Sequence, residues 1–118
     1  MRHSATILVL FLLGPATQAG AHAFLVKSSP AVGSVVQGSV TELRLQFSEP
    51  IELAVSGVEL TNASGAPVPL DIHFADSGHA TLAAKAPMLV SGTYRVKWHV
   101  VSADTHRTEG SFNFTVKP

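Results

Sequence analysis

The stretch that most constrains the fold is residues 93–101, where polar and apolar side chains alternate from Thr93 to Val100. The apolar residues are Tyr94, Val96, Trp98 and Val100, and the polar residues between them are Arg95, Lys97 and His99. A period of two places the two sets on opposite faces of a β-strand. The pattern therefore predicts a half-buried strand, with the apolar set facing a core.

Shorter runs of the same kind recur along the chain. Alternation continues through residues 40–48, 70–74 and 111–116, and further short strands are expected at 23–26, 58–60 and 79–84. Turn signals at residues 62–65 and 76–78 separate some of these runs. After residue 21, no window shows convincing helical spacing. About seven short strands predict an all-β fold, an antiparallel Greek-key β-sandwich or barrel of the immunoglobulin-like type.

Composition narrows the class of protein further. The 118 residues contain no cysteine and carry a formal net charge of zero, with eight basic and eight acidic residues. A balanced charge gives no support for nucleic-acid binding, which requires a basic face. Without cysteine the domain has no disulfides, no thiolate metal ligands and no lipid anchor on a cysteine. One small domain held together by core packing is expected.

The N-terminal region has the order of a secretory signal peptide. Arg2 and His3 precede an apolar run at residues 7–13, and small residues follow up to Ala21. We therefore expect residues 1–21 to be removed and residues 22–118 to form the exported, periplasmic domain. A cut after Ala23 also fits the small-residue rule and would delete His22. The apolar run is far below the roughly 20 residues that span a bilayer. No apolar run after the signal is long enough either, so the mature domain is not expected to be embedded in a membrane.

Asp104 and His106 lie two positions apart, just beyond the longest predicted strand. In an extended backbone, residues i and i+2 point the same way, so both could bind one ion. His22 would add two donors as a free N-terminus, because an α-amino group has a pKa of about 7.7–8.0 and yields its proton to a metal near neutral pH. Three nitrogens and one oxygen suit Cu(II), whereas zinc would favour a tetrahedron. A polar loop and a chance histidine at the cleavage boundary explain the same residues without a metal.

The chain after residue 21 resembles the CopC family of periplasmic copper-binding proteins, which are small β-sandwiches. The likeness is carried by short pieces in order: residues 22–25, 29–30, 47–50, 92–94, 96, 98, 100–104, 106 and 110–112. The resemblance implies that one Cu(II) per chain is bound by His22, through its amine and ring, and by Asp104 and His106. It also implies cleavage after Ala21 and a CopD-type copper transporter of the inner membrane as partner. We expect the protein to be a monomer. Thr105 departs from the pattern, which would have a small residue there, often glycine.

Glu49 and Met88 bear on the same site. Glu49 could accept a hydrogen bond from the N-terminal amine or a ligand histidine, an outer role that fixes ligand orientation. It could equally be a solvated carboxylate beside Pro50. Some relatives bind Cu(I) through a methionine-rich segment, but Met88 is the only methionine after residue 21. Since Cu(I) sites need several soft sulfur ligands, we expect a site for Cu(II) alone.

The leading hypothesis is therefore a carrier that buffers or delivers copper, and not an enzyme. An N-terminal histidine on copper also resembles the histidine brace of copper monooxygenases, so an oxidase is the first alternative. Asp104 as an extra ligand argues against it, because it would fill a position that oxygen chemistry needs open. A metal-free immunoglobulin-like interaction module is the second alternative.

Overall fold

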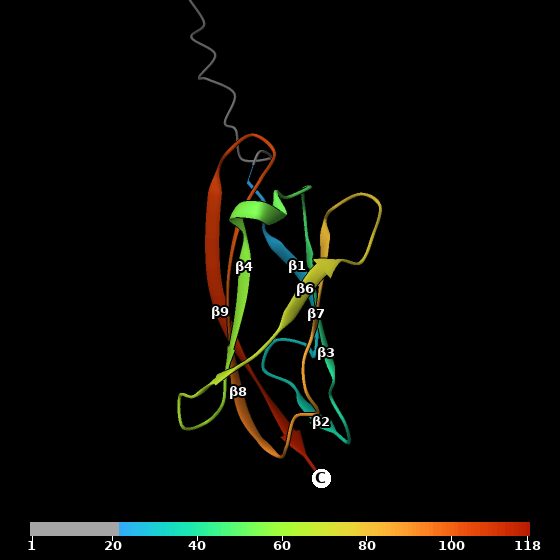
Figure 1. Cartoon of the computed structure of the whole chain (residues 1–118), viewed down its shortest axis with the longest axis vertical. Helices are drawn as coiled ribbons and strands as arrows, with labels where there is room; N and C mark the ends of the chain where they lie inside the picture. Colours follow the sequence, from blue (N-terminus) through green and yellow to red (C-terminus); the bar gives the residue numbers. More distant parts are fainter. Residues whose placement is uncertain (1–21) are drawn as a thin grey trace, which may run out of the picture.

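The computed structural model describes residues 22–118, which form two β-sheets packed face to face (Figure 1). The predicted signal peptide, residues 1–21, lies outside the described residues. The strands are β1 Leu25–Ser29, β2 Val35–Gln37, β3 Glu42–Phe47, β4 Gly57–Thr61, β5 Pro67–Val68, β6 Asp71–Phe74, β7 Thr81–Lys85, β8 Gly92–Val101 and β9 Arg107–Lys117. A short 3₁₀ helix, η2 Leu53–Val55, precedes β4. In this part of the chain, no helix has the length and apolar character needed to cross a bilayer.

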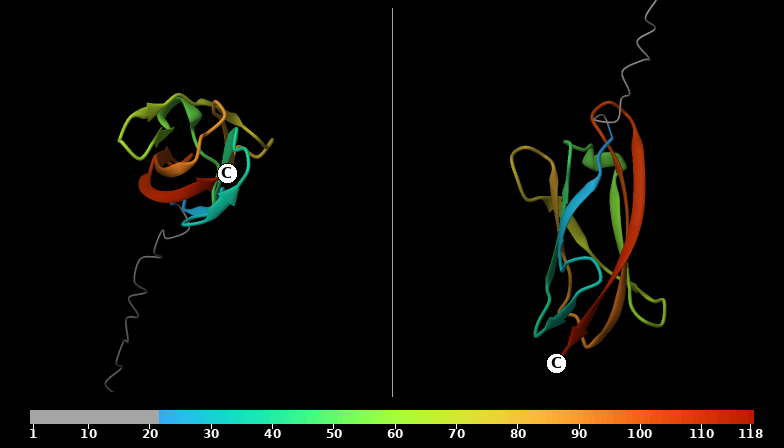
Figure 2. Two further views of the ribbon diagram at one scale, coloured as in Figure 1. Left: turned by 90° about the horizontal axis from the view of Figure 1, so that it is seen from below. Right: turned by 180° about the vertical axis from the view of Figure 1, so that it is seen from behind.

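The strand order confirms the predicted all-β sandwich. One sheet has the order β1-β3-β7-β6 and the other the order β2-β9-β8-β4-β5, and the two layers are seen edge-on in Figure 2. Every strand pair is antiparallel except β2 with β9, which run parallel. The described residues hold nine strands, against about seven predicted. The two that the prediction lacks, β2 and β5, have three and two residues, too few for an alternation to show.

The first strand is displaced from its predicted position. We expected a strand at residues 23–26, but β1 runs from Leu25 to Ser29 and pairs with β3. Ser28 and Ser29 lie opposite Leu45 and Arg44. Backbone pairing alone extends the strand through these two serines, whose small polar side chains gave no apolar signal.

The longest prediction is confirmed. In β8, Tyr94, Val96 and Val100 are buried, and Trp98 is half-buried with its ring edge-on to Phe47 at a centroid distance of 5.2 Å. The strand pairs with β9 over its whole length, from Gly92 opposite Val116 to Val101 opposite Arg107. This hairpin carries its loop, residues 102–106, to one end of the sandwich (Figure 1).

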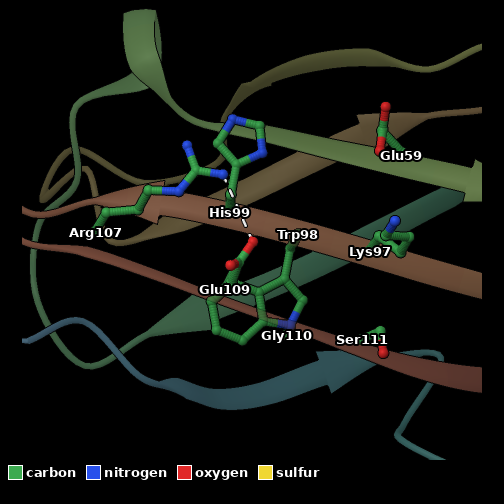
Figure 3. Close-up of a pocket in the computed structure, with 8 residues that line it drawn as sticks. All are labelled: Glu59, Lys97, Trp98, His99, Arg107, Glu109, Gly110 and Ser111. Atoms are coloured by element: carbon green, nitrogen blue, oxygen red, sulfur yellow. Dashed lines mark ion pairs between the residues drawn. The ribbon is translucent and has the colours of Figure 1, made fainter.

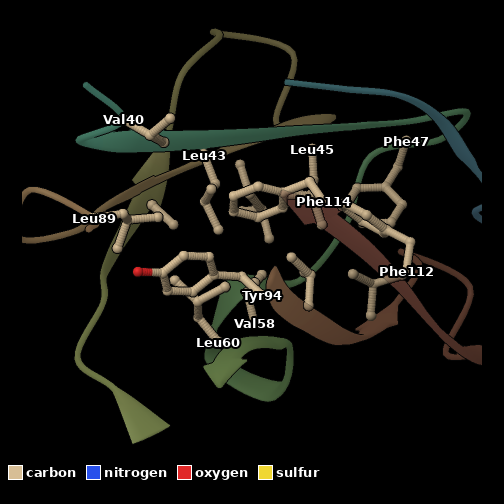
Figure 4. Packing of buried hydrophobic residues seen from close by; sticks show 14 of the residues in the cluster. Val40, Leu43, Leu45, Phe47, Val58, Leu60, Leu89, Tyr94, Phe112 and Phe114 are labelled. Atoms are coloured by element: carbon tan, nitrogen blue, oxygen red, sulfur yellow. The ribbon is translucent and has the colours of Figure 1, made fainter. Parts of the chain in front are cut away.

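Both sheets contribute to one core (Figure 4). Leu43, Leu45 and Phe47 of β3 face Val96 of β8 and Phe114 of β9 across the interior. The Tyr94 ring stacks on Phe114 at 5.5 Å, and its hydroxyl donates to the Val90 carbonyl at 2.7 Å. Each large apolar side chain buried in this way stabilises the fold by about 1.5–3 kcal/mol. Packing alone supports a domain that has no disulfide.

Candidate metal centre

The N-terminal segment reaches the β8–β9 loop because several contacts hold it there. Ala23 is only 1% exposed and belongs to the core. Its carbonyl accepts a hydrogen bond of 2.6 Å from the Thr108 hydroxyl of β9. Ser48 holds the residues on either side, since its Oγ accepts from the Phe24 amide at 2.9 Å and donates to the His22 carbonyl at 3.3 Å. These bonds place His22 beside the β8–β9 loop.

The loop itself is a tight turn and not the extended backbone in which residues i and i+2 would point the same way. The Ser102 amide donates to the His106 carbonyl at 2.9 Å, and the Thr105 amide donates to the Ser102 carbonyl at 2.8 Å. Thr105 has a φ of 72°, in the left-handed region. The expected meeting of Asp104 and His106 still occurs, with His106 Nδ1 lying 3.1 Å from Asp104 Oδ2. The two side chains come together because the turn closes on itself.

The histidine at the start of the described chain and the histidine of the β8–β9 loop lie side by side. The ring centroids of His22 and His106 are 4.6 Å apart. The side chains of His106 and Asp104 are open to solvent, with exposed fractions of 49% and 40%. Within residues 22–118, however, no three His, Cys, Asp or Glu side chains converge closely enough to enclose a metal ion. The structure thus brings the predicted ligands together as two contacting pairs that share His106.

The Asp104 carboxylate is stabilised as an anion. The Ser102 hydroxyl donates to Asp104 Oδ1, and the His106 amide approaches the same oxygen at 3.5 Å. The bond from Ser102 is the main cause that lowers the pKa of Asp104; the interactions with His106 lower it further, and partial desolvation opposes them. Asp104 therefore keeps its charge, the form that binds a metal.

Ser102 is the residue of this site that sequence reasoning missed. It is 2% exposed and is the buried polar residue of the core region. A signal was present in the sequence, because Ser102 continues the inward phase of Val96, Trp98 and Val100. A hydroxyl at an inward position, two residues before a carboxylate, points to a polar contact beneath that carboxylate.

Glu49 lies close to the predicted ligands. Glu49, Pro50, Ser102, Ala103 and Asp104 line one hollow of about 160 Å³. Glu49 is half-buried there. In the described part of the chain, its carboxylate forms no hydrogen bond with His22 or His106. The structure therefore places Glu49 beside Asp104, and its contact with a ligand histidine stays a prediction.

A separate hollow lies on the outer face of the five-stranded sheet (Figure 3). His99 rests on the β4 backbone, where a Cβ at Gly57 would come within 2.7 Å of its ring. Next to it, Arg107 and Glu109 form an ion pair of 3.6 Å. The residues lining this hollow carry both signs of charge and include none of the predicted copper ligands. His99 is thus a packed surface residue, separate from the candidate site.

Comparison with known proteins places the chain among copper proteins. A model of the CopC domain matches residues 25–117. The chain is 36% identical over 115 residues to copper resistance protein C of Escherichia coli, covering 90% of each protein. It is also 31% identical over 112 residues to copper transport protein CutJ of Bacillus subtilis, an alignment covering 93% of this chain but 21% of CutJ.

A solved structure agrees with these sequence matches. The crystal structure of PcoC, a methionine-rich copper resistance protein from Escherichia coli, has a TM-score of 0.76 and 34% sequence identity with this chain. The alignment covers 82% of this chain and all of that one. Family model, sequence relatives and fold point the same way, and the chain belongs to the CopC family.

Proposed function

We propose that this protein binds one Cu(II) ion in the periplasm and serves copper homeostasis by buffering or delivering that ion. The CopC family consists of copper-binding resistance proteins and not of enzymes, which leaves a carrier role. The observation that carries the proposal is the contact between the N-terminal His22 and the β8–β9 loop. His22 contacts His106 at 4.6 Å between ring centroids, while His106 lies 3.1 Å from Asp104.

The spacing of these donors suits a shared ion. Two ligands about 2.1 Å from a metal and at right angles are roughly 3 Å apart. The His106 nitrogen and the Asp104 oxygen, 3.1 Å apart, are close to that value. In our proposal the metal binds both of these atoms. The His22 ring and the freed His22 amine complete a set of three nitrogens and one oxygen, which favours Cu(II).

Burial of Ala23 supports cleavage after Ala21. A cut after Ala23 would remove a core residue that is 1% exposed, together with the carbonyl that accepts the Thr108 hydrogen bond. A cut after Ala21 keeps both and frees the His22 amine beside the histidine of the loop. The buried residue just after His22 thus favours the cleavage site that the copper proposal needs.

Exposure of the ligands supports delivery. Since His106 and Asp104 are open to solvent, an acceptor protein can approach the ion directly. Our proposed acceptor is a CopD-type copper transporter of the inner membrane. The alignment with CutJ, in which a region like this chain is a fifth of a larger copper transport protein, supports such a pairing. All the proposed ligands come from one chain, so a monomer suffices.

The choice of Cu(II) over Cu(I) rests on ligand type. PcoC is described as methionine rich, whereas this chain has two methionines, of which Met88 alone lies after residue 21. Met88 is exposed, in the loop before β8. Thioether sulfur suits Cu(I), and nitrogen and oxygen suit Cu(II).

The proposal is tested by the intact mass of the exported protein together with a Cu(II) titration followed by electron paramagnetic resonance. We expect a chain beginning at His22 and one tetragonal, nitrogen-rich Cu(II) per molecule. His22→Ala, or one extra residue before His22, should weaken binding at least about tenfold because each change removes or displaces a chelating nitrogen. His73→Ala, which removes an exposed histidine of β6, is the matched control.

Two results would reject the site. One is a mature chain that begins at Phe24, because it would lack both donors of His22. The other is unchanged copper affinity in both N-terminal variants, because the chelating terminus would then play no part.

A further inference from the structure

We propose that Ser102 is a positioning residue for the copper ligand Asp104. In this role its hydroxyl fixes the rotation of the carboxylate before the ion arrives and keeps one oxygen free for the metal. The inference rests on the proposed function and adds to it a residue that does not itself touch the ion. Three features of the structure support it. The serine is buried, its backbone is held rigidly, and the two carboxylate oxygens of Asp104 have different partners.

Ser102 stands on a rigid base. Its side chain is 2% exposed. Its backbone pairs with Ile51 in an isolated β-bridge, and its amide and carbonyl bond to His106 and Thr105 across the turn. Because the backbone is held on both sides, the hydroxyl has little freedom to follow a moving partner. Any carboxylate that bonds to it is held in place.

The hydroxyl binds one particular oxygen of Asp104. Ser102 Oγ donates to Oδ1, while Oδ2 faces His106 Nδ1 at 3.1 Å. Oγ also lies 3.2 Å from the His106 carbonyl. A hydroxyl carries one proton, and an ionised carboxylate is a stronger acceptor than a neutral carbonyl. The proton therefore goes to Asp104, and Oδ2 is left for the ion.

This arrangement matters because the other contacts that the described residues make with the Asp104 carboxylate all come from His106, which is itself a proposed ligand. Asp104 lies on a turn, and its side chain is 40% exposed. Without Ser102 the carboxylate could rotate toward solvent, and copper binding would have to restrict it again. Outer groups that orient a metal ligand typically change metal affinity by about 10- to 100-fold when they are removed.

A double-mutant cycle on the exported protein tests the role. Cu(II) affinity is measured by competition with a chelator for the unsubstituted chain, Ser102→Ala, Asp104→Ala and the double variant. We expect Ser102→Ala to weaken binding about 10- to 100-fold and to change the copper hyperfine splitting, because the oxygen donor shifts. In the Asp104→Ala background, Ser102→Ala should have no further effect, since a residue that acts through Asp104 has nothing left to position.

Two further variants separate positioning from folding. Ser102→Thr keeps the hydroxyl and should restore affinity and spectrum. Ser34→Ala removes a buried hydroxyl that has no hydrogen-bond partner among the described residues, and it should leave copper binding unchanged. Thermal unfolding of each metal-free variant shows whether it is folded at the temperature of the titration.

The outcomes distinguish this role from the proposed function. If the unsubstituted chain binds no Cu(II), the proposed function is rejected, and the positioning role of Ser102 is rejected with it. If the chain binds copper but Ser102→Ala keeps both affinity and spectrum, only the positioning role is overturned. Equal losses from Ser102→Ala with and without Asp104 would also overturn it, because the serine would then act through the fold in general.

Discussion

Thr105, the residue between two proposed ligands, holds an unusual backbone conformation. Its φ of 72° lies in the left-handed region, which a β-branched residue rarely adopts. That conformation costs a residue with a Cβ roughly 1–2 kcal/mol. The turn nevertheless needs it, because the reversal at Thr105 lets His106 return to within 3.1 Å of Asp104. The expectation of a small residue at this position, often glycine, thus has a physical basis.

Thr105→Gly should therefore stabilise the metal-free protein. Relief of roughly 1–2 kcal/mol of strain outweighs the loss of about 0.5–1 kcal/mol that glycine's freedom in the unfolded chain costs. We expect the free energy of unfolding in urea to rise by up to about 1 kcal/mol. Thr93→Gly in β8, where φ is negative, is the control. It relieves no strain, so it should lower the free energy of unfolding by about 0.5–1 kcal/mol. Equal losses in the two variants would show that Thr105 is not strained.

At the level of elements, the patterns that repeat within a strand were predictable and the pairings between distant segments were not. The inward positions of β8 follow from alternation alone, and Tyr94, Val96 and Val100 are buried as predicted. No local pattern indicates that the Ala23 carbonyl meets the Thr108 hydroxyl, 85 residues away. Such a contact depends on how the two sheets stack. Donor chemistry suggested His22 as a partner of His106 beforehand, and the family resemblance decided for it.

The β8–β9 loop shows that local patterns can also fail to predict the backbone over only a few residues. Asp104 and His106 were expected on one side of an extended backbone that continues beyond the predicted strand, which ends at Val101. The ladder in fact ends there, and the chain turns at residues 103–105. Asp104 and His106 meet for a different reason, the bonds across the turn from Ser102 and Thr105. The pair was predictable as a pair, whereas the inward position of Ser102 was a signal that the sequence reasoning did not use.

The bond between the N-terminal segment and β9 can be tested with Thr108→Val, which removes the hydroxyl and keeps the shape of the side chain. The Ala23 carbonyl would lose its 2.6 Å donor. A buried acceptor left unpaired costs about 1–3 kcal/mol, so the free energy of unfolding in urea should fall by that amount. Copper affinity should fall as well, because His22 would be less firmly held beside His106.

The control for this variant is Thr115→Val on the same strand. Thr115 Oγ1 bonds to Thr93 Oγ1 in an exposed pair, outside the candidate site. Loss of this exposed hydrogen bond should lower the free energy of unfolding only slightly and leave copper affinity unchanged. A Thr108→Val protein that keeps full copper affinity would show that Ser48 and the core position of Ala23 hold the terminus by themselves.

For the whole molecule, the proposed copper site joins the two sheets at one end. His22 leads into β1 of the four-stranded sheet, whereas Asp104 and His106 belong to the β8–β9 hairpin of the five-stranded sheet. A bound ion would thus cross-link both layers of a sandwich that has no disulfide. The link exists only in the folded state, since the unfolded chain does not hold His22 beside residues 104–106.

Cu(II) should therefore stabilise the domain, and only when the chain begins at His22. A ligand that binds only the native state adds about 2.7 kcal/mol at a free concentration of 100 times Kd, which appears in calorimetry as a rise in Tm. A chain beginning at Phe24 should show no comparable rise, because it lacks the chelating histidine. It should also be less stable without metal, since it loses the buried Ala23 and the bond to Thr108.

A chain with one extra residue before His22 separates these two effects. It keeps Ala23 and its hydrogen bond, so its metal-free Tm should equal that of the chain beginning at His22. Its amine is displaced from the His22 ring, so most of the copper-induced rise should disappear. If all three chains gained the same Tm with Cu(II), the ion would be binding elsewhere, and the link between the sheets through His22 would be wrong.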